Sequence, residues 1–238
     1  MSEKITLTLA MKKIQIAGCL ISITKELFDL SKINLNEYVV DTEAIPESTL
    51  RKDNVTEKDY TIGYYRDICR RLIYKDVLPF HGAAVKLQGK DEAYVFAGPS
   101  GAGKSTQARL WKKNLGQQAL ILNDDRPFFR FEEKQIIVCG SPWKGKHHIG
   151  ENGEASLKAV CFVKKDKKNQ IIRIPPDQAF ALLLRQCFPT HEYADKVMVL
   201  VERITRTIPI WELSCTLSTD AFDVAYQAMV IDNGKKAE

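Results

Sequence analysis

No apolar run in the sequence approaches the roughly 20 residues that a membrane-spanning helix needs. The segment 1–20 contains an apolar stretch, but Lys12, Lys13 and Gln15 interrupt it, unlike the continuous apolar centre of a signal peptide. We therefore expect a soluble, cytoplasmic protein with no membrane partner.

Cysteine motifs are also lacking. The six cysteines form no CxxC pair, and none lies at metal-finger spacing from the four histidines. Most lie inside apolar runs, as Cys161 does within residues 159–163, where a reduced thiol behaves as a small hydrophobic group. The pattern predicts neither a zinc site nor a disulfide framework.

Charge of one sign is not in large excess. The chain has 35 Lys and Arg residues against 30 Asp and Glu residues, a net charge of +5 that is dispersed along the sequence. This distribution does not predict a nucleic-acid partner. Apolar residues make up 45% and charged residues 27%, which is typical of a globular protein. At about 150 residues per domain, 238 residues suggest one large domain or one domain with an appendage.

The patterning divides the chain near residue 75. Residues 1–75 are predicted to form a small N-terminal α+β lobe, with two short strands within 3–24, a polar connection over 40–58 and a helix over 61–74. This lobe either docks an extended substrate at a sheet edge or serves packing alone. Residues 76–238 are predicted to be the functional core, a mixed α/β fold with many antiparallel strand pairs.

Within the core, three hairpins are expected. Their paired strands are 83–87 with 93–97, 128–131 with 135–139, and 158–163 with 170–174. Further strands are expected at 119–122, 203–207 (an edge strand) and 211–215, and helices from about 104 to 114, 176–187 and 219–231. The lysine-rich segment 164–168 is interpreted as a solvated turn.

The strongest motif is a complete GxxxxGK[ST] loop between an expected strand and an expected helix. It consists of Gly98, Pro99, Ser100, Gly101, Ala102, Gly103, Lys104 and Ser105, and Thr106 follows it. Glycines allow backbone N–H groups to converge on an anion, and the helix that follows adds its positive end. Lys104 is expected to reach the β- and γ-phosphates of a nucleotide, and Ser105 to ligate Mg²⁺. The alternative is a glycine turn with an incidental lysine.

An acidic pair, Asp124 and Asp125, ends the expected strand 119–122. One carboxylate beside a phosphate loop is expected to meet the magnesium ion. A second is free to orient or deprotonate an attacking hydroxyl, which favours transfer to an alcohol over simple hydrolysis. The alternative is an Asp-Asp turn that starts the next hairpin.

Three further candidates carry weaker signals. His81 begins the hairpin that enters the loop and is either a site residue or a hydrogen-bonded structural histidine. Arg126 either stabilises charge on a transferring phosphoryl group or is a surface arginine.

The segment 140–148 is the third candidate. It combines an aromatic ring with cations on a glycine-punctuated loop, and its candidate residues are Trp143, Lys144, Lys146 and His147. The cations suit a phosphate or a peptide carboxylate, and Trp143 could stack on a base. The alternative is a mobile basic loop whose tryptophan lies in the core.

These motifs together resemble a known family. The order of Phe80-His81-Gly82, the phosphate loop, and Asn123-Asp124-Asp125 is similar to the catalytic core of HPr kinase/phosphorylase and its relatives. The segment 140–147 is similar to a signature of small HPr-kinase-like proteins, among them lasso-peptide kinases and proteins labelled as phosphoenolpyruvate-carboxykinase-like. The resemblance implies a mixed-sheet P-loop kinase core of the HPr kinase/PEP carboxykinase type.

The resemblance also implies site roles. The γ-phosphate of ATP would pass to a serine hydroxyl, with Asp124 as the base and with Asp125 and Ser105 holding Mg²⁺. His81 would position Asp124 or the phosphate. The N-terminal lobe, 1–75, is too short for the family's regulatory domain, and the family's later glycine-rich signature has no counterpart here. A stand-alone kinase is therefore expected.

The leading hypothesis is an ATP-dependent serine kinase for a peptide, a small protein or a small molecule. One alternative is a nucleotide-binding switch without transfer chemistry, which would not need two adjacent carboxylates. The other is a PEP-carboxykinase-like lyase, whose extra arginine and lysine ligands have no evident place in the sequence. Whether the chain forms a homo-oligomer, as HPr kinases do, stays open.

Overall fold

The computed structural model describes residues 11–24, 35–41, 57–187, 193–216 and 218–232. The strands are β1 (Met11–Ile16), β2 (Cys19–Thr24), β3 (Val39–Asp41), β4 (Val77–Pro79), β5 (Gly82–Leu87), β6 (Glu92–Ala97), β7 (Ala119–Asn123), β8 (Phe128–Phe131), β9 (Ile136–Cys139), β10 (Glu154–Lys165), β11 (Gln170–Arg173) and β12 (Ile210–Cys215). The helices are α2 (Glu57–Tyr74), α3 (Lys104–Leu115), α4 (Pro176–Leu184), α5 (Ala194–Thr207) and α6 (Asp220–Tyr226), which a π-helical segment continues through Gln227–Asp232.

A mixed sheet forms the centre of the molecule. Its strands run in the order β4-β8-β9-β10-β6-β5-β7, and β12 branches from β10 and pairs with β11 on its other side. β6, β10 and β12 are parallel to one another. Ala159–Val163 of β10 is a continuous buried run, as expected of a strand that is covered on both faces.

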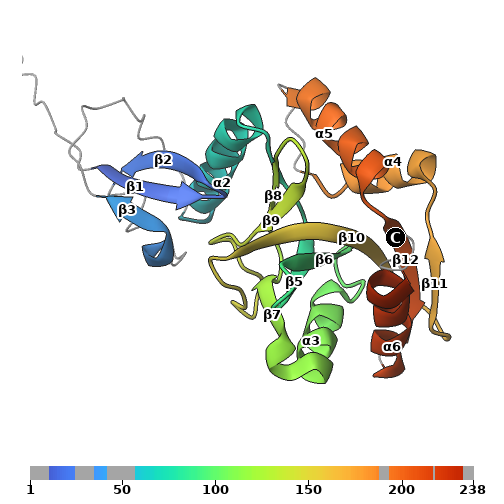
Figure 1. Ribbon diagram of the computed structural model, residues 1–238. Coiled ribbons are helices and arrows are strands. Elements are labelled where there is room, and N and C mark those ends of the chain that lie inside the picture. The colour runs from blue at the N-terminus through green and yellow to red at the C-terminus, as the bar shows by residue number, and fades with distance from the viewer. Residues whose placement is uncertain (1–10, 25–34, 42–56, 188–192, 217, 233–238) are drawn as a thin grey trace, which may run out of the picture.

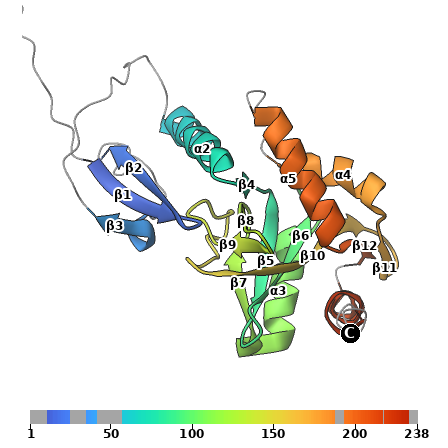
Figure 2. The same cartoon turned by 45° about the horizontal axis from the view of Figure 1, so that its top comes forward.

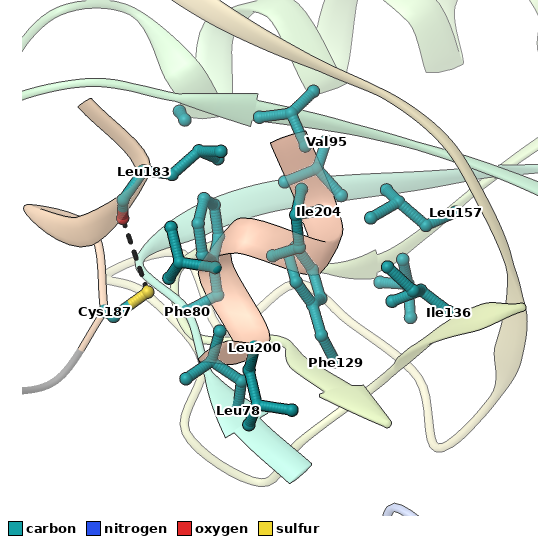
Figure 3. Close-up of a cluster of buried hydrophobic side chains, with 14 of the residues drawn as sticks. Leu78, Phe80, Val95, Phe129, Ile136, Leu157, Leu183, Cys187, Leu200 and Ile204 are labelled. Atoms are coloured by element: carbon teal, nitrogen blue, oxygen red, sulfur yellow. Dashed lines mark hydrogen bonds between the residues drawn. The ribbon is translucent and has the colours of Figure 1, made fainter. Parts of the chain in front are cut away.

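Helices cover both faces of this sheet (Figure 1). α3 and α6 lie on one face, where Trp111 is fully buried and its ring contacts those of Phe96 and Phe222. α4 and α5 lie on the other face, as Figure 2 also shows. The cluster on that face includes the stacked rings of Phe80 and Phe129 (Figure 3). The arrangement is the mixed α/β class that the sequence predicted.

The N-terminal residues build a separate small sheet. Its strand order is β2-β1-β3, and both pairings are antiparallel. A third apolar cluster joins Ile14 and Ile16 of this sheet to Ile68 and Leu72 of α2 and to Phe128 of the core. The earliest part of the predicted strands, residues 3–10, lies outside the described residues.

Two of the three predicted hairpins are confirmed, and the third is wrong. β5 pairs with β6 and β8 pairs with β9, both antiparallel. β11 does not pair with β10, because β12 lies between them. Leu213 of β12 is fully buried, whereas Gln170, Ile172 and Arg173 of β11 are exposed. The more apolar strand therefore takes the covered position and β11 becomes the edge.

Residues 203–207 do not form the predicted edge strand, because they are the last turns of α5. Residues 203–207 alone are too short a window to distinguish the alternation of a strand from the periodicity of a helix. Val197, Leu200, Val201 and Ile204 are buried and recur at the spacing of one helix face, which a longer window reveals. Among the described residues, no helix combines the length and the apolarity required to cross a membrane.

Candidate active site

Residues Gly98–Gly103 connect β6 to α3, and Lys104 and Ser105, the last residues of the Gly98–Ser105 motif, are the first two residues of that helix. Gly98, Gly101 and Gly103 have φ values of +132°, +78° and +113°, a region that residues with a side chain rarely adopt. Gly98 also lies against β10, because a Cβ there would be 3.1 Å from the carbonyl oxygen of Val163. The first N–H groups of any helix have no intrahelical partner, and no side chain caps the N-terminus of α3. The loop has the features of an anion-binding helix start.

Lys104 lies inside the loop rather than in solvent. It is 7% exposed, and Nζ donates to the carbonyl oxygens of Gly98 at 3.0 Å and Pro99 at 3.1 Å. Burial lowers the pKa of Lys104, while the charge of Asp125 acts in the opposite direction. The ammonium group is therefore close enough to Asp125 for this carboxylate to affect its pKa.

Strand directions bring the acidic pair to the same edge of the sheet as the loop. β5 is antiparallel to both β6 and β7, so the last two run in the same direction and end at one edge. A hydrogen bond links the two ends, because Ser105 Oγ donates to the carbonyl oxygen of Asp124 at 3.1 Å. The first turn of α3 and the Asp124-Asp125 pair therefore form one continuous site.

Asn123 organises this edge, and its role was not assigned from the sequence. It is fully buried, and its Oδ1 accepts the N–H groups of Asp125 at 2.8 Å and Arg126 at 2.6 Å. Its Nδ2 donates to the carbonyl oxygens of Ser141 at 3.0 Å and Trp143 at 3.3 Å. An asparagine that ends a strand before two aspartates is a turn signal, and it could have indicated the hydrogen bonds of Asn123 Oδ1 to the N–H groups of Asp125 and Arg126. The hydrogen bonds of Asn123 Nδ2 depend on a separate segment of the chain, the 140–148 loop.

The loop 140–148 covers Asp124. That residue is 4% exposed, and its Oδ1 accepts the N–H of Gly145 at 2.6 Å. A Cβ at Gly145 would lie 3.1 Å from Oδ2 of the same carboxylate, so a side chain at this position would be crowded against it. The carboxylate is thus held in one orientation by a backbone donor.

The Asp125 carboxylate is contacted by the side chains of His81 and Arg126. His81 Nε2 is 3.5 Å from Oδ1, and Arg126 Nε donates to Oδ2 at 3.3 Å. The Arg126 guanidinium also lies over the ring of Tyr65, 4.5 Å from its centre. The resemblance implied that His81 would position Asp124 or the phosphate, whereas the structure places it against Asp125.

The electrostatics of Asp125 favour its ionised form. Burial alone would raise the pKa of this carboxyl group, but the hydrogen bond from His81 and the charge of Arg126 outweigh burial. The pKa of Asp125 is consequently lower than its ordinary value. A carboxylate that resists protonation suits the binding of a cation better than the acceptance of a proton.

Replacing His81 by alanine is expected to raise the pKa of Asp125. The substitution removes the largest of the contributions that lower it and leaves the burial that raises it. Titration of the Asp125 side-chain carboxyl carbon by NMR measures the shift, with Asp223 on the exposed face of α6 as an internal reference. An unchanged Asp125 titration in His81→Ala would show that the two side chains are not coupled.

The side chains of the 140–148 loop have different surroundings. The hypothesis that Trp143 stacks on a base is corrected: the residue is 6% exposed and packs against Tyr65 and Phe128, with ring centres 5.0 and 5.9 Å away. Its large apolar ring is covered by α2 and β8, as in the alternative that placed this tryptophan in the core. Lys144 Nζ is 3.9 Å from Glu37 Oε2. Lys146 and His147 are exposed next to the covered aspartate.

The donor set at this edge fits a magnesium ion that binds together with phosphates. Ser105 offers a hydroxyl oxygen and Asp125 a carboxylate, and such hard oxygen ligands suit Mg²⁺. Among the residues that the structure describes, no cluster of three or more His, Cys, Asp or Glu side chains could hold a metal without help. Mg²⁺ commonly keeps several waters and uses one or two carboxylates plus substrate phosphates, so this sparse set is sufficient.

Comparison with known proteins gives matches among solved structures. No protein-family model and no curated protein matches the chain. Among solved structures, the chain is similar to the HPr(Ser) kinase/phosphatase from Coxiella burnetii, at 9% sequence identity and a TM-score of 0.38. The match covers 67% of this chain and 97% of the other.

Proposed function

We propose that this chain is an ATP-dependent phosphotransferase that moves the γ-phosphoryl group to an alcohol, in particular a serine hydroxyl of a peptide, a small protein or a small molecule. The observation that carries the proposal is the hydrogen bond from Ser105 Oγ to the backbone of Asp124. It joins the start of the phosphate-loop helix to a pair of adjacent carboxylates. A site for nucleotide binding alone needs the loop but not the pair.

Each residue of the site has its own role in phosphoryl transfer. The loop amides and Lys104 bind the β- and γ-phosphates, and Lys104 leaves the carbonyl groups of Gly98 and Pro99 to do so. Ser105 and Asp125 would hold a Mg²⁺ ion, which would neutralise phosphate charge when bound. Arg126 stays beside Asp125 and adds positive charge at the transferring group.

Asp124 acts as the base. The N–H of Gly145 orients one carboxylate oxygen, and the other accepts the proton of the incoming hydroxyl. The acceptor oxygen forms a bond to the γ-phosphorus, the bond from that phosphorus to the β,γ-bridging oxygen breaks, and ADP leaves. Because Asp124 is covered, the part of the loop that follows Gly145 must shift to admit the acceptor, and its exposed Lys146 and His147 then face that acceptor.

Incubation with γ-labelled ATP, MgCl₂ and a library of serine-containing peptides tests this function. We expect label on serine and none on matched peptides in which alanine replaces serine. Release of ADP and phosphate without a labelled acceptor, for peptides and for small alcohols alike, would instead indicate a nucleotide-driven switch. Phosphoenolpyruvate formed only with oxaloacetate would indicate a lyase. Either result contradicts the proposal.

A further inference from the structure

A cavity of about 360 Å³ opens directly beside the phosphate loop, on the side away from the acidic pair. The loop forms one wall through Gly98–Ala102, and the other walls come from β10, β12 and α4. The residues contributed by those elements are Phe162, Val163, Lys164, Lys165, Glu212 and Leu182. None of them was a candidate from the sequence, in which Lys164 and Lys165 were interpreted as part of a solvated turn.

The order of the strands places this cavity in line with the rest of the site. The loop follows β6, whose neighbours are β10 on one side and β5 and then β7 on the other. β10 is parallel to β6, with Phe162 paired to Ala97, so both strands end at the edge that carries the loop. Ligands of parallel α/β sheets bind outside the carboxyl ends of such strands. The cavity and the acidic pair therefore flank the loop on opposite sides.

The walls of the cavity combine apolar surface with a few polar groups. Phe162 and Leu182 supply apolar surface. Val163 lies against two glycines of the loop: a Cβ added at Gly98 would be 3.1 Å from its carbonyl oxygen, and one added at Gly103 would be 3.6 Å from its Cγ1. Glu212 is half-buried and adds one carboxylate. An apolar pocket with a few polar groups is the usual composition of a small-molecule site.

We propose that this cavity binds the nucleoside of the nucleotide, its base and ribose, while the phosphate chain crosses the loop towards the acidic pair. Phe162 and Leu182 contact the base, and the Glu212 carboxylate accepts a hydrogen bond from a ribose hydroxyl or an exocyclic amine. Lys164 and Lys165 lie at the exposed mouth and complement the charge of the phosphates. The inference rests on the proposed function, because it assumes that the loop binds a nucleoside triphosphate.

Calorimetric titration with two probes, ATP and inorganic tripolyphosphate, tests this assignment. Leu182→Trp places an indole in the cavity and is expected to weaken ATP binding at least tenfold while tripolyphosphate binds as in the wild type. Glu212→Gln is expected to weaken ATP binding several-fold, again without an effect on tripolyphosphate. Ala181→Trp adds the same indole to an exposed position of α4 and is expected to change neither affinity.

The outcomes separate this inference from the proposed function. If the wild type binds both probes and the Leu182 and Glu212 variants bind ATP normally, the nucleoside lies elsewhere and only the cavity assignment is overturned. ATP binding no tighter than tripolyphosphate overturns it as well. If neither probe binds the wild type, the phosphate-loop function fails and the cavity assignment fails with it. Should Leu182→Trp not fold, judged by its thermal melt, the Glu212→Gln comparison decides alone.

Discussion

Asp124→Asn is expected to bind ATP as tightly as the wild type and to transfer the phosphoryl group about 10²- to 10⁴-fold more slowly, the usual contribution of a general base. The amide keeps the shape of the carboxylate, and its oxygen can still accept the N–H of Gly145. The change therefore removes proton acceptance with little disturbance of the covering loop. Calorimetry measures ATP affinity, and release of ADP in the presence of the acceptor measures turnover.

Asp125→Asn provides the comparison that separates the two carboxylates. It is expected to raise the Mg²⁺ concentration needed for half-maximal activity, whereas Asp124→Asn leaves that concentration unchanged. Asp223→Asn, at an exposed position of α6, serves as the matched control and should behave as the wild type. An Asp124→Asn protein that keeps more than about a tenth of wild-type turnover would remove the residue from the role of base.

Lys104→Met is expected to lose most ATP binding and to lower kcat/KM by roughly 10²- to 10³-fold, the effect of deleting one well-placed charge-stabilising donor. Methionine keeps an unbranched chain of similar length in the buried loop interior but has no ammonium group. The carbonyl groups of Gly98 and Pro99 also lose their donor, so the thermal melt must be recorded together with the calorimetric titration.

Lys113→Met is the control for Lys104→Met, because it removes the same charge from an exposed position of the same helix. It should leave both ATP affinity and kcat/KM unchanged. If a folded Lys104→Met protein binds ATP within about twofold of the wild type, Lys104 is not a phosphate ligand. If Lys104→Met and Lys113→Met both lower ATP affinity by the same factor of about two, the effect comes from the net charge of the protein rather than from the loop.

The predictions that held were mostly those that depend on neighbouring residues. The β5–β6 hairpin, the helix after Gly103 and the strand that ends at Asn123 follow from local alternation, turn residues and helix spacing. Two of the predictions that failed depended on distant partners. β11 lost its expected partner to β12, from which α4 and α5 separate it in the chain, and Trp143 is buried by α2, which precedes the whole central sheet.

The helix α5 was missed for a different reason. Residues 203–207 taken alone alternate like a strand, and only the buried face that begins at Val197 identifies the helix. A short segment carries too little periodicity to distinguish the two structures, and tertiary packing selects the one that buries more apolar surface. Asn123 was also only partly predictable. Its turn is a local sequence signal, but its hydrogen bonds to Ser141 depend on a distant segment of the chain.

The sequence by itself determined the Gly98–Ser105 loop. Its shape depends on glycines that tolerate positive φ and on a lysine only a few residues from the carbonyl groups that it contacts, so no distant partner is required. The tertiary structure alone decided the separate surroundings of the two aspartates. Gly145 covers Asp124 from the loop that follows β9, and His81 reaches Asp125 from the start of β5. Strand pairing sets those contacts, and it depends on which surfaces the whole chain can bury together.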